Sequence, residues 1–264
     1  MCGINGIIKN NIQDKDIINI KKMNSVLQHR GPDASDVWSN EYVALGHTRL
    51  SIIDVDNRSN QPFIKDGLVI IYNGEIYNYK SLKKLLPNTK WLTNSDTEVV
   101  LELWRTYKEK SLNMLRGMFS FAIYDLKTND TFLVRDHFGI KPLYYLKDNE
   151  KFFFSSELKA IESTLDVKLR ISLTGVVASM MYAWIPEQNC IYKDVKKVLP
   201  GQYIHVNSNK INIYTYWTSK TLLEKPVKFK SKKESLEHLG HTLEDSVKNH
   251  LVSDVPVNAF LSGG

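Results

Sequence analysis

The sequence predicts an α+β domain in which antiparallel sheets are layered against segregated helices. Short β-rich segments, each bounded by turn residues, dominate the first two thirds of the chain, which is the pattern of antiparallel strands. Between them lie a few segments in which apolar residues recur at intervals of three and four, as they do on an amphipathic helix. The sequence contains no internal repeat and no low-complexity tract, so a layered domain accounts for most of the chain.

The individual elements follow from these two patterns. Strands are predicted at residues 2–8, 43–47, 68–72, 118–124, 131–135, 143–146 and 151–155. Helices are predicted at residues 16–28, 81–86, 96–107, 157–161 and 173–182. Pro200 and Gly201 then turn the chain into a further strand, residues 202–205, which precedes a polar stretch at residues 207–212.

A domain boundary is predicted near residue 218. Residues 1–218 form the layered domain, and residues 219–232 are predicted to be a linker because they include Pro226 and many lysines and lack sustained periodicity. Residues 233–264 begin a second unit. It contains a helix at residues 233–251 and an apolar strand at residues 255–261.

Composition excludes several classes of protein. The net charge of +6 comes from scattered lysines with no basic stripe interleaved with aromatic residues, so no nucleic-acid surface is expected. No apolar run is long enough to span a membrane and no secretory signal is present, so a cytoplasmic location without membrane contact is predicted. Cys2 and Cys190 are too few for a disulfide framework, and Cys190 is predicted to be a buried structural thiol. The histidines and cysteines lack paired ligand spacing, so no metal site is predicted.

Cys2 is the strongest candidate for a catalytic residue. Removal of Met1, which a small second residue permits, would place a thiol and a free α-amine on the same residue. Cysteine has the largest thiolate fraction of the nucleophilic side chains near neutral pH, and an amine of lowered pKa can accept its proton directly or through a water. The alternative is that Cys2 is a small hydrophobic residue at the start of a strand.

Asn73 and Gly74 are candidate donors for an oxyanion. They follow the apolar run at residues 68–72, so a side-chain amide and a bare backbone N–H are expected together at a strand end, with Glu75 next to them. Asn-Gly is also the commonest signal for a hairpin turn, and the segment alone does not decide between the two.

Two charged residues are candidates for holding a substrate. The planar guanidinium of Arg49 could bind a carboxylate through two parallel hydrogen bonds, although a surface arginine is the default. Asp96 lies in Ser95-Asp96-Thr97-Glu98, which has the form of a capping box and places a carboxylate in the first turn of a helix. The same carboxylate could receive an ammonium group.

Together these segments resemble, in order and spacing, the glutamine-hydrolysing part of asparagine synthetases, which are class II glutamine amidotransferases with an N-terminal nucleophile. The resemblance covers essentially the whole chain. Its main motifs are Met-Cys-Gly-Ile-Asn-Gly at residues 1–6, His-Arg-Gly-Pro-Asp at 29–33, Gly-His-Thr-Arg-Leu-Ser-Ile at 46–52, Gln-Pro-Phe at 61–63, Tyr-Asn-Gly-Glu-Ile-Tyr-Asn at 72–78, Ser-Asp-Thr-Glu at 95–98, Arg-Gly-Met-Phe-Ser-Phe-Ala at 116–122 and Arg-Asp-His-Phe-Gly-Ile-Lys-Pro-Leu-Tyr-Tyr at 135–145. Ser-Ser-Glu-Leu-Lys-Ala at 155–160 and Leu-Pro-Gly at 199–201 follow.

The resemblance implies a layered α/β/β/α sandwich of the N-terminal-nucleophile hydrolase type and a role for each candidate residue. Cys2 attacks the side-chain amide of L-glutamine, and Asn73 with the Gly74 N–H stabilises the oxyanion. The remaining roles concern glutamine binding: Arg49 holds the α-carboxylate, Asp96 and Glu75 lie near the α-ammonium, and Ile52 helps form the pocket. The motif at residues 29–33 is predicted to be a turn with local pairing, without a catalytic step.

Family members continue into a synthetase domain that activates aspartate with ATP and magnesium. Their pyrophosphate loop reads Ser-Gly-Gly-x-Asp-Ser, whereas this sequence contains only Ser262, Gly263 and Gly264 of it. This cofactor-binding loop is therefore expected to be incomplete and unable to bind ATP usefully. The resemblance implies that glutamine hydrolysis needs no cofactor and that the synthetase part is truncated in this sequence. It also implies a possible homodimer in the full-length enzyme.

Three functions stay open at this point. The first is an active glutaminase that supplies ammonia to an asparagine synthetase. The second keeps the glutaminase but sends ammonia to another acid, for instance a sugar carboxylate in polysaccharide biosynthesis, because a fold does not fix the acceptor. The third is a catalytically idle regulatory or partner-binding fragment.

Overall fold

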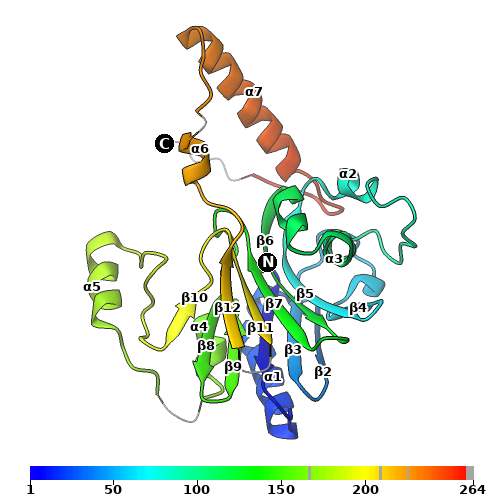
Figure 1. Cartoon of the computed structure of the whole chain (residues 1–264), viewed down its shortest axis with the longest axis vertical. Coiled ribbons are helices and arrows are strands. Elements are labelled where there is room, and N and C mark those ends of the chain that lie inside the picture. The colour runs from blue at the N-terminus through cyan, green and yellow to red at the C-terminus, as the bar shows by residue number, and fades with distance from the viewer. Residues whose placement is uncertain (166–167, 208–209, 225, 260–264) are drawn as a thin grey trace.

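Two six-stranded antiparallel sheets form the centre of the molecule in a computed structural model that describes residues 1–165, 168–207, 210–224 and 226–259 (Figure 1). Sheet A contains, in spatial order, β10 (Val195–Lys197), β8 (Tyr144–Asp148), β9 (Lys151–Ser155), β1 (Gly3–Ile8), β3 (Val43–Arg49) and β2 (Ala34–Ser39). Sheet B contains β12 (Lys210–Thr215), β11 (Gln202–Asn207), β7 (Asp130–Arg135), β6 (Gly117–Asp125), β5 (Leu68–Ile76) and β4 (Phe63–Lys65).

Helices cover the outer face of each sheet. On sheet A, α1 (Asp14–Leu27) and α4 (Leu158–Glu162) share a buried apolar cluster with β1 and β9. On sheet B, α2 (Tyr79–Lys83), α3 (Asp96–Tyr107) and the 3-10 helix η3 (Lys108–Met114) share a second cluster with β5 and β6. A third cluster fills the space between the sheets. These three apolar layers define an α/β/β/α sandwich, which confirms the predicted α+β class.

The remaining helices lie outside these layers. They are the 3-10 helices η1 (Gln28–Arg30) and η2 (Asn57–Ser59), and the helices α5 (Leu173–Tyr182), α6 (Lys220–Glu224) and α7 (Lys232–His250). Figure 1 shows α7 projecting from one end of the sandwich. The α6 turn lies inside the segment predicted to be a linker, so that segment is partly helical.

The sequence did not predict β12, which includes residues 210–212 of the polar stretch. Pairing with β11 satisfies the backbone groups of these residues although Lys210 and Asn212 are polar. One predicted strand is wrong. The apolar strand predicted at residues 255–261 does not form over 255–259, where no described segment pairs with it, and a strand needs a partner for its backbone groups. Residues 260–264, with Ser262, Gly263 and Gly264, lie outside the described residues.

The alternation of side chains along three strands positions the functional site. Ile4 of β1, Leu45 of β3 and Ile71 of β5 all belong to the cluster between the sheets. Residues two positions further along a strand point to the same face. The space between the sheets is therefore apolar in its middle, and Cys2, Arg49 and Asn73 point into it at one end.

Candidate active site

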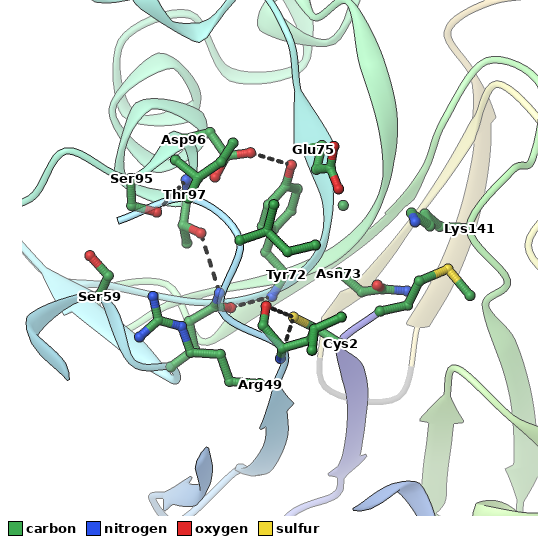
Figure 2. Close-up of a pocket in the computed structure, with 16 residues that line it drawn as sticks. Cys2, Arg49, Ser59, Tyr72, Asn73, Glu75, Ser95, Asp96, Thr97 and Lys141 are labelled. Carbon is green, nitrogen blue, oxygen red and sulfur yellow. Dashed lines mark hydrogen bonds between the residues drawn. The ribbon is translucent and has the colours of Figure 1, made fainter. Parts of the chain in front are cut away.

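A pocket at this end of the sandwich contains every residue predicted for glutamine: Cys2, Arg49, Ile52, Asn73, Gly74, Glu75 and Asp96. The space between its walls, including the open mouth, is about 500 Å³. Figure 2 shows side chains from both sheets, from the loop after β3 and from the start of α3 around this space. A concave pocket with convergent polar groups is the usual form of a small-molecule site.

The Cys2 thiol lies at the floor of the pocket and contacts the loop that follows β3. The Leu50 N–H donates to Cys2 Sγ at 3.4 Å, and the thiol faces the Leu50 carbonyl oxygen at 3.6 Å. Burial raises the pKa of the thiol, while the Leu50 N–H, the terminal amine and Arg49 act in the opposite direction. Cys2 belongs to none of the three described apolar clusters, so the alternative of a hydrophobic strand residue does not fit its position.

Asn73 and Gly74 lie inside β5, not in a turn. They face Ser120 and Phe119 of β6, and the strand continues to Ile76. The expectation of a strand end, and the alternative of a hairpin turn, are both wrong. A Cβ atom on Gly74 would lie 2.4 Å from the Met118 carbonyl oxygen, so only glycine fits this close approach of the two strands.

Both groups have unused hydrogen-bonding capacity. The Asn73 side chain is 1% exposed, yet neither its amide oxygen nor its amide nitrogen has a partner among the residues that the structure describes. The N–H groups of Tyr72 and Ile76, two positions either side of Gly74, point away from β6 and donate to the side chains of Gln61 and Asp96. By the same alternation the Gly74 N–H also points away from β6. The Asn73 amide, without a partner among the described residues, and the Gly74 N–H thus come from adjacent residues in the pocket wall.

Arg49 is a buried cation that is held by neutral atoms. Its Nη1 donates to Asp56 O at 2.9 Å and to Asn60 Oδ1 at 2.6 Å, and its Nη2 donates to Asp54 O at 2.5 Å. These bonds use three of the five guanidinium N–H groups, which leaves Nε–H and one Nη2–H. Arg49 is 5% exposed and forms no ion pair in the described part of the chain, and burial lowers its pKa. Its charge lacks a close counter-ion, as expected of a carboxylate receptor.

Asp96 begins α3 and faces the opposite wall. Its Oδ2 accepts hydrogen bonds from Tyr72 Oη at 2.8 Å and from the Ile76 N–H at 2.9 Å. Burial raises the pKa of this carboxyl, and these two donors act in the opposite direction. Asp96 therefore has a fixed orientation and is the acid that a buried ammonium group would favour.

The predicted capping box at the start of α3 forms only in half. Ser95 is the N-cap, and its Oγ accepts from the Thr97 N–H at 3.0 Å. Glu98 does not return to the Ser95 N–H. It accepts from the backbone N–H groups of Leu92 and Thr93 and pairs with Lys65 at 2.7 Å. The reason is that a buried lysine is a stronger partner for a buried carboxylate than a neutral N–H.

Two charged residues at the site, Arg30 and Lys141, were given no catalytic or binding role by the sequence. Arg30 Nε donates to Cys2 O at 3.0 Å, and its Nη1 pairs with Glu157 at 2.9 Å. Lys141 is 3% exposed and lines the pocket, and in the ranges described its side-chain ammonium has neither a hydrogen bond nor an ion pair. Burial lowers the pKa of the chain's terminal amine, and Lys141 and Arg30 lower it further, whereas Cys2 raises it. The signal for them was their presence in the motifs at residues 29–33 and 135–145.

Glu75 and Ile52 complete the walls. Burial raises the pKa of Glu75, and the nearby Lys141 acts in the opposite direction. Ile52 lies in the segment 50–61, here called the pocket loop, which supplies all the oxygen atoms bound by Arg49. This loop is held from the far end of the chain: Asp254 N donates to Ile52 O at 3.0 Å, and Asp54 N donates to Asp254 Oδ2 at 2.7 Å.

Other predicted features can be placed only within the ranges described. Cys190 is buried, as predicted. Among these residues there is no cluster of side chains that could hold a metal ion, and no helix is both long and apolar enough to cross a membrane. The candidate pyrophosphate loop, Ser262 to Gly264, lies outside the described residues.

Comparison with known proteins agrees with this geometry. Residues 1–217 match a family model for the glutamine amidotransferase domain, and residues 238–264 match the start of a model for asparagine synthase. The chain is 36% identical to the protein named asparagine synthetase (glutamine-hydrolysing) 3 of Bacillus subtilis, over 100% of this chain and 44% of that protein. It is also 36% identical to a putative asparagine synthetase of Methanocaldococcus jannaschii, over 100% and 55%. The chain thus spans about half the length of the curated relatives it matches.

The fold has relatives among solved structures. Glutamine phosphoribosylpyrophosphate amidotransferase from B. subtilis superposes with a TM-score of 0.61, at 20% identity, over 82% of this chain and 50% of that chain. At this identity the likeness shows the fold alone, which is the predicted layered sandwich. The extent of the family match and the relatives that cover the whole chain lead to one conclusion: the chain belongs to the glutamine amidotransferase domain family, of the type found at the N-terminus of asparagine synthetases.

Proposed function

We propose that this chain hydrolyses the side-chain amide of L-glutamine through a thioester on Cys2, as the ammonia-supplying part of a glutamine-hydrolysing asparagine synthetase. The observation that carries the proposal is the buried Asn73 amide, unpaired among the described residues, in the wall of the same pocket as the Cys2 thiol. Leaving a buried amide without a partner costs about 1–3 kcal/mol. A bound group that accepts a hydrogen bond from it during the reaction accounts for this cost.

The steps follow from the groups at the site. Once Met1 is removed, the α-amine of Cys2 accepts the thiol proton, and Sγ attacks the amide carbon while the carbonyl electron pair moves to oxygen. The Asn73 amide and the Gly74 N–H donate to this oxyanion. The C–N bond then breaks, ammonia leaves with the proton from the amine, and water hydrolyses the thioester to glutamate. A single oxyanion donor is worth roughly 3 kcal/mol.

Substrate choice follows from the two charged anchors. Arg49, with two free N–H groups, receives the α-carboxylate, and Asp96, assisted by Glu75, receives the α-ammonium. Ile52 packs against the methylene groups. Because both anchors bind the same end of the substrate, they fix how far its amide reaches, and asparagine, one methylene shorter, does not bring its amide to Cys2.

The acceptor of the ammonia is proposed from the relatives. Those named asparagine synthetases support aspartate as the acceptor, with ATP and magnesium required by the synthetase part and no cofactor required by the glutaminase. A 33% identical relative is named an amidase, from Gibberella zeae, which keeps the second function open: the same glutaminase serving another acid. The third function, an idle fragment, has no observation in its favour.

The test is release of glutamate from glutamine by the purified chain, compared with Cys2→Ala and with Cys190→Ala as the matched thiol control. Mass spectrometry of the intact protein establishes whether Met1 is absent. We expect activity in the wild-type chain and in Cys190→Ala, and none in Cys2→Ala. A folded chain with a free N-terminal Cys2 and no glutamate release, or a fully active Cys2→Ala variant, would overturn the proposal.

A further inference from the structure

His47 forms the hydrogen bond that joins the two sheets beside the candidate active site. It lies on β3 of sheet A, is completely buried, and its Nε2 is 3.1 Å from the carbonyl oxygen of Tyr72 on β5 of sheet B. A carbonyl oxygen only accepts, so Nε2 must carry the proton. Burial lowers the pKa of His47 to about 4, which keeps the ring neutral near pH 7.

This bond takes the place of pairing with a neighbouring strand. β4 pairs with Leu68 to Ile70 only, so from Tyr72 onward the edge of β5 that faces away from β6 has no neighbouring strand among the residues that the structure describes. Two side chains take its place at Tyr72: Gln61 Oε1 accepts from the N–H at 2.6 Å, and His47 donates to the carbonyl oxygen. With its hydroxyl bound to Asp96, Tyr72 is held at all three of its polar atoms.

The two ends of the bond lie next to the two halves of the proposed reaction centre. On β3, Arg49 lies two residues beyond His47. β3 also pairs with β1, the strand that begins directly after Cys2, so His47 and Cys2 lie on neighbouring paired segments of sheet A. On β5, Asn73 directly follows Tyr72. Elsewhere between the sheets the described contacts near β3 and β5 are apolar, as at Leu45 and Ile71, and apolar packing is not directional. A directional contact at this position fixes the distance between the nucleophile and the oxyanion donors.

The other ring nitrogen of His47 indicates that this residue does more than fill space between the sheets. His47 Nδ1 is buried and has no partner within the described residues. An apolar residue of similar volume would fill the same space without the cost of an unpaired nitrogen. We propose that His47 is a positioning residue, which rests on the proposed function: its bond to Tyr72 O holds the Asn73 amide and the Gly74 N–H at the distance from Cys2 that the tetrahedral intermediate requires.

The test compares His47→Leu, which removes the donor, with His47→Gln, whose amide nitrogen is close to the position of Nε2. Thr48→Val is the matched control, because Thr48 is a buried polar residue on the same strand that bonds to Leu27 O on the other face. Each variant is assayed for kcat and KM with glutamine. Each is also assayed for binding of glutamate and of L-glutamate γ-semialdehyde. With the semialdehyde, Sγ adds to the aldehyde carbon and the thiol proton passes to its oxygen, which forms a stable tetrahedral adduct.

We expect kcat of His47→Leu to fall roughly 10- to 100-fold and semialdehyde binding to weaken by a similar factor, because both depend on the oxyanion donors. KM and glutamate binding should change less than about threefold, since they depend on the ground state. His47→Gln should recover most of the loss, and Thr48→Val should keep wild-type kcat.

Two results would overturn the inference while leaving the proposed function in place. One is a His47→Leu variant with wild-type kcat. The other is a variant that loses glutamate and semialdehyde binding by the same factor, which is the signature of general disruption. If His47→Leu does not fold, His47→Asn is used in its place, because its shorter side chain does not reach Tyr72 O. Full kcat in His47→Asn would also overturn the inference. A wild-type chain without glutaminase activity would instead refute the proposed function itself.

Discussion

Asp96→Asn is the most informative single change for the glutamine site. The substitution removes a charge and keeps the shape: the remaining amide oxygen can still accept from Tyr72 Oη and the Ile76 N–H, as Oδ2 does now. Burial raises the pKa of Asp96, which means that folding disfavours its charged form. The variant should therefore be as stable as the wild type near pH 7 or slightly more stable.

The expected cost falls on substrate binding. A carboxylate and an ammonium about 4 Å apart interact by roughly 4 kcal/mol at an effective dielectric constant near 20. Desolvation of the two groups reduces this to about 3 kcal/mol, so kcat/KM for glutamine should fall about 150-fold. In the wild type, KM should rise as the pH falls through the raised pKa of Asp96, because only the ionised carboxylate attracts the ammonium.

The assay compares glutamine with glutaramate, which is glutamine without its α-amino group. In the wild-type chain, glutaramate should be the poorer substrate by a similar factor, and in Asp96→Asn the two substrates should become nearly equal. Glu75→Gln is the matched control and should change this preference by less than about tenfold, since Glu75 is only half-buried. If Asp96→Asn impairs glutaramate as much as glutamine, the carboxylate acts through Tyr72 and β5, and the reasoning about the ammonium is refuted.

Three further predictions concern groups around the pocket. Asn73→Leu should lower kcat by about 100- to 1,000-fold, because it removes an oxyanion donor. It should not lower the free energy of unfolding, because the Asn73 amide has no partner in the described structure. A clear loss of stability in urea denaturation would contradict this prediction. Asp254→Ala should raise KM for glutamine about three- to tenfold, because it releases the pocket loop from its contact with Asp254. Asp245→Ala, on the exposed face of α7, is the control and should leave KM unchanged. Equal effects of the two substitutions on KM would contradict this prediction. Burial raises the pKa of Glu98, but Lys65 and backbone N–H groups outweigh burial and hold this pKa below the ordinary value of a glutamate side chain. The ion pair therefore stabilises the fold while Glu98 is ionised, and this contribution is lost as the pH falls through the lowered pKa. Lys65→Met should thus cost about 3 kcal/mol at pH 7 and less near pH 3; a deficit that does not change with pH would contradict this.

Local patterns were sufficient for most of the fold. The short β-rich runs of β6 and β7 and the three-and-four spacing of apolar residues in α1 and α3 are local properties of the sequence, and they were sufficient to predict these elements. Cys2 could also be predicted as a candidate nucleophile from the sequence, because the pairing of a thiol with a terminal amine depends only on the position of the cysteine in the chain.

The tertiary structure decided where local patterns were ambiguous. Asn73-Gly74 has the composition of a turn, and only pairing with β6, more than forty residues further along the chain, keeps it in a strand. Glu98 has the spacing of the second residue of a capping box, but it forms an ion pair with Lys65 instead of bonding to the Ser95 N–H. His47 and Lys141 lie in motifs that carry the family resemblance, but a motif does not show which atoms a side chain contacts. Only the packing of the two sheets places His47 against Tyr72 O and Lys141 in the same pocket as Cys2 and Asn73. Local propensities are worth a few tenths of a kcal/mol to about one per residue, whereas a buried charge or an unpaired backbone group costs several, so long-range contacts determine these positions.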